Sequence, residues 1–303
     1  MDANTEKIIC RLPEELRNMI ENLPSSTTDK LEEIRLKADE DSLLICGGRE
    51  INLHDRPAVT PEVLEDILNR LLDYSYYAYE EELSRGYITI EGGHRVGVCG
   101  RVTLEGDKVC LIKDVSSLNI RRSRQILGAS DRIIDSVCGE TLNSTLIISP
   151  PKCGKTTILR DLARALSERG YRVSVCDERS EIAGCCNGRS SYDLGCRTDI
   201  LDGCPKAEGI IMLIRAMSPD VIITDEIGRK EDVKAIEAAL CAGVKIITTI
   251  HGNSYEDVAS SSVGELVTSR VFDTLIFLSS NPSTGTVRRI MKLSKIPGRG
   301  EKC

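Results

Sequence analysis

The stretch SPPKCGKTT, residues 149–157, has the residue types and spacing of a loop that binds nucleotide phosphates. In such a loop, backbone N–H groups and a helix N-terminus face the phosphates, a lysine reaches the β and γ oxygens, and a hydroxyl residue binds magnesium. We therefore expect Lys155 to bind phosphates and Thr156 to support Mg²⁺. The predicted ATP-binding residues are Ser149, Pro150, Pro151, Lys152, Cys153, Gly154, Lys155, Thr156 and Thr157.

Ser149 stands where the pattern G-x-x-x-x-G-K-[ST] has its first glycine. Pro150 pushes its predecessor into the extended region, which any L-residue adopts, so serine should cost little there. Gly154, at the point of closest backbone approach, is retained. Lys152 adds a charge inside the loop that either tightens phosphate binding or points to solvent. The alternative is an ordinary helix start, but the strand (LIIS) before and the helix (TTILRDLARAL) after favour the loop.

Two carboxylates follow a second apolar run, PDVIITDEIG. A carboxylate at such a strand end can hold magnesium through its water shell, so we expect Asp225 to support Mg²⁺. The adjacent Glu226 could polarise the attacking water as a catalytic residue. Acids also cap helices, so this pair is common by itself, but its spacing after the loop favours cooperation between the two motifs.

A third apolar run ends in TTIHGN and contains one of only three histidines. If this strand lies between the other two, Thr248, Thr249 and His251 are placed to sense a γ-phosphate. A partly buried histidine that is satisfied by the backbone is the alternative.

Charged residues elsewhere could complete the site. The segment VCDERSEIAG follows another apolar strand, and three of its acids could reach the magnesium shell, although a solvated helix start fits as well: Asp177, Glu178 and Glu181. Residues 94–124 hold seven Lys and Arg against three acids. Arg121 and Arg122 are candidates for an arginine finger that reaches a neighbouring subunit, and a solvated basic face is the alternative.

The elements that position these residues fall into two segments. Residues 1–125 mix strand-like runs, including DSLLICGGREINL with a Gly47-Gly48 turn, with helix-like runs such as residues 60–85, which predicts a small α+β domain. In residues 126–303 apolar strands alternate with amphipathic helices, which is typical of a parallel βαβ sheet. The tyrosines of residues 74–79 have helical spacing, which favours domain packing.

Composition limits the setting. The chain has 303 residues, 41% of them hydrophobic, with a net charge of −7, which argues against a general nucleic-acid coat. No apolar stretch approaches a membrane span, and the charged start with 13 cysteines favours a reducing cytosol. Four cysteines cluster in residues 184–205 without a C-x₂-C pair, so we predict no zinc site there, and we interpret this segment as a mobile loop.

Together, SPPKCGKTT, VCDERSEIAG, IRAMSPDVIITDEIGR and TTIHGN resemble the type II/type IV secretion ATPases, a P-loop group with a RecA-like core. YAYEEELSRGYITIEGGHRVGVCGR and SSLNIRRSR make the chain more similar still to a sporulation subgroup from endospore-forming bacteria, over residues 31–293. The resemblance implies that Glu178 and His251 match the acidic and histidine boxes of that group.

The resemblance further implies an ATPase that uses ATP and Mg²⁺ to build or energise a secretion-like channel complex around the forespore. Such relatives form homo-oligomers, usually hexameric rings, that act on membrane-embedded partners while staying cytoplasmic or peripheral, here in the mother cell. Two alternatives stay open. One is a nucleic-acid-dependent RecA-like ATPase, against which the acidic charge and the lack of a basic–aromatic platform count. The other is a nucleotide-gated scaffold with negligible hydrolysis.

Overall fold

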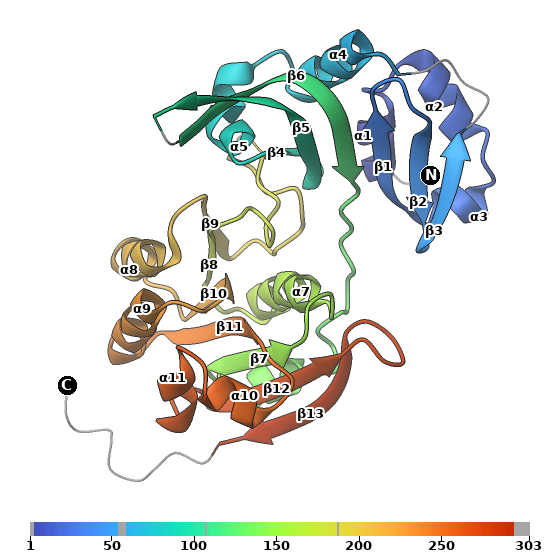
Figure 1. Cartoon of the computed structure of the whole chain (residues 1–303). Helices are drawn as coiled ribbons and strands as arrows, with labels where there is room; N and C mark the ends of the chain where they lie inside the picture. The colour runs from blue at the N-terminus through green and yellow to red at the C-terminus, as the bar shows by residue number, and fades with distance from the viewer. Residues whose placement is uncertain (1–2, 54–58, 107, 187, 294–303) are drawn as a thin grey trace. The chain divides into compact units, whose positions relative to one another are not determined.

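The computed structural model describes residues 3–53, 59–106, 108–186 and 188–293. The chain forms two compact units (Figure 1). Unit 1 comprises Met1–Arg124 and Gly184–Ser191, and unit 2 comprises Gln125–Ala183 and Tyr192–Cys303. Unit 1 therefore takes in a short segment that belongs, by sequence, to the second half of the chain.

Unit 1 is built on an antiparallel six-stranded sheet with the order β3-β2-β1-β6-β5-β4. Its strands are β1 (Leu31–Lys37), β2 (Ser42–Cys46), β3 (Arg49–Leu53), β4 (Tyr87–Ile90), β5 (His94–Glu105) and β6 (Lys108–Arg121). Its helices are α1 (Ala3–Ile9), α2 (Glu14–Glu21), α3 (Ser25–Thr28), α4 (Pro61–Leu71), the 3₁₀ helix η1 (Tyr76–Tyr79) and α5 (Glu80–Ser84). Apolar residues of these helices and of one sheet face form a single core.

Local chemistry explains the hairpin and the first part of the helix predicted for residues 60–85. Gly47 and Gly48 link β2 to β3 with φ of +59° and +74°, conformations that glycine adopts without strain. Helix α4 begins where the Thr60 hydroxyl accepts the N–H of Val63, and it buries leucines and isoleucines at helical spacing: Leu64, Ile67, Leu68 and Leu71.

The prediction of one long helix over residues 60–85 is wrong. Asp73 and Tyr74 adopt φ of +48° and +58°, so the chain leaves the helix after Leu71 and resumes as η1 and α5. The expected packing of the tyrosines is also wrong for most of them. Tyr79 is buried, whereas Tyr77 is 94% exposed, and Tyr74 and Tyr76 are exposed as well.

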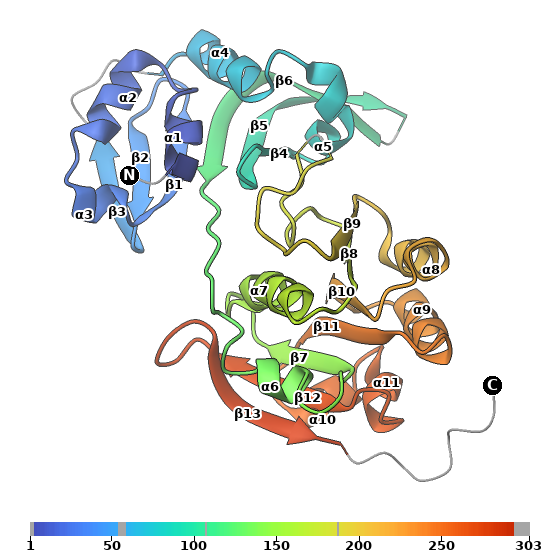
Figure 2. The ribbon, with the colours of Figure 1, turned by 180° about the vertical axis from the view of Figure 1, so that it is seen from behind.

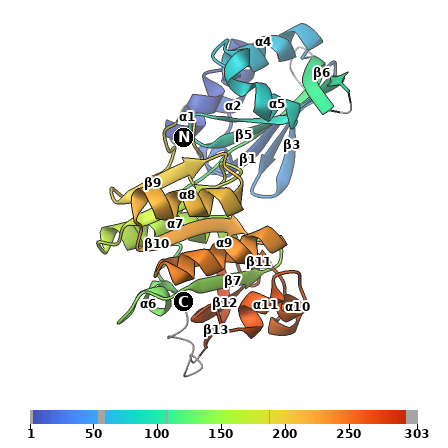
Figure 3. The same ribbon diagram turned by 90° about the vertical axis from the view of Figure 1, so that its left-hand side faces the viewer.

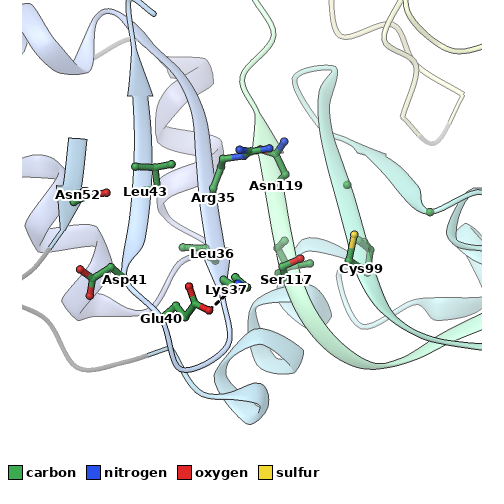
Figure 4. Close-up of a pocket in the computed structure, with 14 residues that line it drawn as sticks. Arg35, Leu36, Lys37, Glu40, Asp41, Leu43, Asn52, Cys99, Ser117 and Asn119 are labelled. Carbon is green, nitrogen blue, oxygen red and sulfur yellow. Dashed lines mark hydrogen bonds and ion pairs between the residues drawn. The ribbon is translucent and has the colours of Figure 1, made fainter. Parts of the chain in front are cut away.

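The sheet face of unit 1 that lies opposite the core carries a groove of about 590 Å³ (Figure 4). Residues of β1 that alternate with the buried Ile34 and Leu36 reach it, among them Arg35 and Lys37. Glu40 also lines this groove and forms an ion pair with Lys37, with Lys37 Nζ 2.7 Å from Glu40 Oε1. Cationic and anionic side chains are therefore interspersed there, unlike the uniformly basic surface of a phosphate-backbone binder.

Unit 2 contains a seven-stranded sheet with the order β13-β12-β7-β11-β10-β8-β9, in which only β13 runs antiparallel to its neighbour (Figures 1 and 2). Its strands are β7 (Thr145–Ser149), β8 (Val173–Asp177), β9 (Thr198–Asp202), β10 (Val221–Glu226), β11 (Lys245–His251), β12 (Thr274–Ser279) and β13 (Thr286–Lys292). The inner strands are apolar and buried, as parallel strands covered by helices require.

Helices of unit 2 cover both faces of this sheet, as Figure 3 shows for α8 and α9 in front. They are α6 (Ile134–Val137), α7 (Lys155–Glu168), α8 (Lys206–Met217), α9 (Lys230–Cys241), α10 (Tyr255–Ala259) and α11 (Gly264–Thr268). Side chains of α8, α9, α10 and α11 share one core with alternate strand residues. The crossover from β7 to β8 runs in the opposite direction along the sheet from those that lead to β10, β11 and β12, and crossovers of one hand then place α7 on the other face.

Residues 184–205 are not simply the loop that the sequence suggested. Thr198–Asp202 forms the edge strand β9, parallel to β8, and Gly184–Ser191 belongs to unit 1. Within unit 1, the Tyr79 hydroxyl lies 3.6 Å from Cys186 Sγ, and the Ser191 hydroxyl accepts the N–H of Gly92 at 3.1 Å.

Candidate functional site

The loop between β7 and α7 has the backbone shape of an anion cradle. β7 ends at the buried Ser149, and α7 begins at Lys155 after Gly154, whose φ is +81°. A side chain on Gly154 would meet Thr284 Cγ2 at 3.2 Å, so the position has little room as well as an unusual backbone. Within the part of the chain described, the N–H groups of Lys152 and Cys153 have no hydrogen-bond acceptor, which leaves them for a ligand.

The Lys155 ammonium lies inside this loop. It donates to the main-chain oxygens of Ser149 at 3.3 Å and Pro150 at 3.2 Å, and it lies 3.4 Å from the Ser149 hydroxyl. The departure at the first position of the motif therefore adds a polar contact to the lysine. Burial lowers the pKa of Lys155, and the charge of Glu226 opposes that shift.

His251 joins the loop to the carboxylate strand. Lys155 Nζ lies 2.9 Å from His251 Nδ1, and His251 Nε2 lies 2.8 Å from Glu226 Oε2. Because an ammonium can only donate, Lys155 donates to Nδ1, and Nε2 is the ring nitrogen that faces Glu226. The first residue of α7 and the last residues of β11 and β10 thus form a continuous chain of side-chain contacts.

Strand register produces this arrangement. β11 lies between β7 and β10, which is the condition on which the predicted role of His251 depended. His251 pairs with Ser149 and Glu226 pairs with Thr249, so the side chains meet at the carboxyl edge of the sheet. Thr248 has a different task from the one expected, because its buried hydroxyl donates to the main-chain oxygen of Asp225 at 2.7 Å.

Asp225 is the most buried carboxylate at this edge of β10, with 8% exposure. Burial raises its pKa, and Lys206 opposes that shift, with Nζ 2.7 Å from Asp225 Oδ1. This ion pair is the one close contact recorded for Oδ1 among the described residues. A nearly buried carboxylate at a strand end is a suitable outer ligand for a hydrated divalent cation.

The residues present fit magnesium in the form that phosphate-loop sites use. The described residues contain no group of three or more His, Cys, Asp or Glu arranged to hold a metal. Phosphate-loop magnesium needs no such group, because one hydroxyl, one carboxylate, water and the phosphates supply its ligands. Thr156, in the first turn of α7, and Asp225, in β10, carry a hydroxyl and a carboxylate of these kinds.

Two acids after β8 differ in environment. Glu178 is half-buried and lies 3.7 Å from Lys206 Nζ and 3.9 Å from Arg229. Asp177 is fully buried and accepts the N–H groups of Glu181, Ile182 and Ala183, so it shapes the chain after β8 instead of facing the cavity. Burial raises the pKa of Asp177 to about 7, against the opposing hydrogen bonds from Ala183 and Glu181.

Buried charges fix α7 against its surroundings. Asp161 accepts the N–H of Gly128 at 3.1 Å and both the N–H and the hydroxyl of Ser130, at 2.8 and 2.6 Å. Arg160 donates to the main-chain oxygens of Ile182 and Glu181 and stacks on the Tyr192 ring at 3.7 Å. The helix whose N-terminus faces the cradle is therefore held from both sides.

Unit 2 has a cavity at the carboxylate cluster and another beside the loop. One, of about 360 Å³, is lined by Glu178, Lys206, Asp225, Glu226, Arg229 and His251, among others. The second, of about 270 Å³, lies beside Gly154, Thr157 and Ile158, and Thr284 and Gly285 from the β12–β13 turn also line it. The less charged cavity thus adjoins the loop directly, and the charged one is linked to it through the contact of His251 with Lys155.

Unit 2 brings together the residues predicted for the loop, the carboxylate strand and both boxes, but not the two arginines. Arg121 is exposed at the end of β6 in unit 1, and Arg122 donates to the main-chain oxygens of Asp29 and Leu31. Exposed Lys152 has φ of +61°. Sequence reasoning missed Lys206, whose only signal was its place at the start of an apolar helix.

Comparison with known proteins places these features in a family. The family model described as "Sporulation stage III, protein AA" matches residues 2–296. Stage III sporulation protein AA of Bacillus subtilis (strain 168) is 44% identical over 286 residues, which cover 92% of each chain. SEEDLING PLASTID DEVELOPMENT 1 of Arabidopsis thaliana is 30% identical over 48% of this chain and 21% of that protein.

Solved structures show the same fold. The Legionella pneumophila ATPase DotB superposes with a TM-score of 0.55 at 17% identity, over 82% of this chain and 72% of that one. The pilus retraction motor PilT, solved with bound ADP, gives a TM-score of 0.56 at 17% identity, over 82% and 74%. The prediction of a RecA-like core that a smaller α+β part precedes in the sequence is therefore confirmed. No helix among the described residues is both long and apolar enough to span a bilayer.

Proposed function

Because the chain belongs to the sporulation stage III protein AA family, we propose that it is an ATPase that binds and hydrolyses ATP during endospore formation. The observation that carries this proposal is the chain of contacts from Lys155 through His251 to Glu226, with Asp225 beside it. These groups supply a phosphate cation, a phosphate sensor, a base and a magnesium-supporting carboxylate at one sheet edge.

Binding follows from the geometry of the loop. The free N–H groups after Pro151 and the N-terminus of α7 receive the β-phosphate, and Lys155 turns from His251 to the β and γ oxygens. The cavity beside Gly154 and Thr157 takes the nucleoside, because the charged cavity holds the reacting groups. Magnesium, held by Thr156 and Asp225, would neutralise charge on the phosphate oxygens.

Hydrolysis then depends on Glu226. Its carboxylate orients the attacking water and accepts a proton from it as the γ-phosphoryl group departs. His251 bonds to Glu226 through Nε2 and to Lys155 through Nδ1, so it loses one partner when Lys155 binds phosphate. This exchange makes the orientation of Glu226 sensitive to nucleotide.

We place this activity in a secretion-like channel complex that the ATPase assembles or drives. The chain would form a homo-oligomeric ring, a hexamer in our proposal, in the mother-cell cytoplasm and at the membrane through membrane-embedded partners. Family membership and the fold support this role. Arg121 is our candidate for a finger acting on a neighbour's nucleotide, because it is exposed while Arg122 binds carbonyl groups of its own unit.

ATP turnover per subunit, measured against protein concentration with and without single-stranded DNA, tests the proposal. Lys155→Ala should abolish ATP binding, whereas Lys152→Gln, a matched loss of one loop cation at an exposed position, should largely retain it. Glu226→Gln should bind ATP but turn over about 10²-fold more slowly. Turnover that needs DNA would support the nucleic-acid-dependent alternative, and binding without turnover in the wild type would support the scaffold.

Mixed rings test the role across subunits. Arg121→Ala and Glu226→Gln subunits each lack one half of a composite site, so mixing them should restore part of the activity at hybrid interfaces. Absence of recovery in rings that demonstrably contain both subunits would remove Arg121 from this role.

A further inference from the structure

Lys206 is a buried cation that the proposed chemistry does not use. It is the first residue of α8 and is 6% exposed. An ammonium so far from water is costly unless anionic groups surround it. Its Nζ lies 2.7 Å from Asp225 Oδ1 and 3.7 Å from Glu178 Oε2, and it also donates to the main-chain oxygen of Glu226. Every partner thus belongs to the carboxylate cluster of the candidate site.

Among the described residues, Lys206 is the cation that forms an ion pair with Asp225. Asp225 is nearly buried, whereas the two arginines that line the same cavity, Arg179 and Arg229, are exposed, and Arg229 contacts Glu178 instead. Removing the ammonium would leave the Asp225 carboxylate buried with no cation in contact. A divalent cation would then be the natural replacement, because hard carboxylate oxygens are its preferred ligands.

We propose that Lys206 is an internal counter-ion that keeps the Asp225 cluster from taking up a divalent cation unless nucleotide phosphates arrive with it. The proposal rests on the proposed function only in taking Asp225 as the magnesium-supporting carboxylate. With Lys206 in place, the cluster has too little net negative charge to dehydrate magnesium alone. The phosphates of a nucleotide supply the missing negative charge, so metal and nucleotide bind as a pair.

The test measures thermal unfolding of the full chain by calorimetry in EDTA and in millimolar Mg²⁺ at matched ionic strength, without nucleotide. We expect wild-type protein to show no shift with Mg²⁺. Lys206→Met should unfold at lower temperature in EDTA and be restored by Mg²⁺, with Mg²⁺ binding at least about tenfold tighter than in the wild type. Lys245→Met is the matched control, because it breaks a second Lys–Asp pair of 2.9 Å, with Asp273, away from the site. It should lose stability without any response to Mg²⁺.

A double variant, Lys206→Met with Asp225→Asn, separates charge from packing. With neither charge buried, it should recover stability relative to Lys206→Met and should not respond to Mg²⁺. The proposal is overturned if wild-type protein is stabilised by Mg²⁺ alone as strongly as Lys206→Met is, or if Lys206→Met gains no response. A double variant that stays unfolded also overturns it, since Lys206 would then be needed for packing. The measurement does not depend on turnover. If the wild type meets these expectations but hydrolyses no ATP, the proposed hydrolysis is rejected and the counter-ion role of Lys206 stands.

Discussion

Replacing Asp161 by alanine should release α7 from the segment that precedes β7. The Asp161 carboxylate is fully buried and accepts two hydrogen bonds from Ser130, which is itself fully buried, and one from Gly128. A buried donor left without a partner costs about 1–3 kcal/mol. The two Ser130 donors alone therefore predict a loss of about 2–6 kcal/mol in the stability of unit 2.

Glu168→Ala supplies the control on the same helix. Glu168 pairs with Arg164 at 2.7 Å, as Asp161 does, but its side chain is 56% exposed. An exposed pair of this kind contributes at most about 1 kcal/mol. Both substitutions thus remove a carboxylate from α7. They differ in how buried that carboxylate is and in whether buried donors are left without an acceptor.

Native-state hydrogen exchange, read by mass spectrometry on peptides of α7, measures the opening free energy of that helix directly. ATP affinity should weaken in Asp161→Ala and not in Glu168→Ala, because Gly128 and Ala129 line the cavity beside the loop. If the two variants differ by less than about 0.5 kcal/mol in the opening of α7, the hydrogen bonds of Ser130 do not hold the helix, and the reasoning fails.

Three further outcomes follow from the loop and from β8. Gly154→Ala should abolish ATP binding and cost about 1–2 kcal/mol, because φ is +81° and Thr284 leaves no space; unchanged affinity by titration calorimetry would contradict this. Ser149→Gly should keep ATP affinity within about twofold and destabilise by about 1 kcal/mol in urea unfolding, since the motif glycine is not needed by an extended residue. For Asp177, with its pKa raised to about 7, the folded state binds the proton more tightly, so wild-type stability falls as pH rises from about 4 to 7. Asp177→Asn cannot titrate at this position, so its loss of unfolding free energy relative to wild type should shrink across that range by up to about 4 kcal/mol. A loss that does not change with pH would refute the raised pKa of Asp177.

The loop, the carboxylate strand and the histidine strand could be predicted because each is encoded locally. An apolar run, a glycine-lysine-threonine turn and an amphipathic helix occur in sequence order around Lys155, and the same holds for Asp225 after its strand. Parallel strands then bring their carboxyl ends to one edge, so local signals suffice to collect the site.

Lys206 could not be found this way. A lysine at a helix start is ordinarily solvated, and its burial arises only because α8 begins beside the end of β10, a non-local pairing that no short window contains. The end of the helix after Leu71 was not predicted for a different reason. The apolar spacing continues as if the helix did, whereas Asp73 and Tyr74 take positive φ, which the residue types do not signal. The edge strand β9 was missed because its residues alternate only weakly in burial.

The excursion of Gly184–Ser191 into unit 1 has a consequence for how this protein can be divided or recombined. The chain passes from one unit to the other three times, after Arg124, Ala183 and Ser191. Cutting once after Arg124 leaves the second fragment with an unsupported segment and strips unit 1 of the partners of Tyr79 and Gly92. The two units are interwoven along the polypeptide, so exchange between homologues must transfer two separate pieces together. Gene fusion or truncation at a single boundary does not reproduce either module.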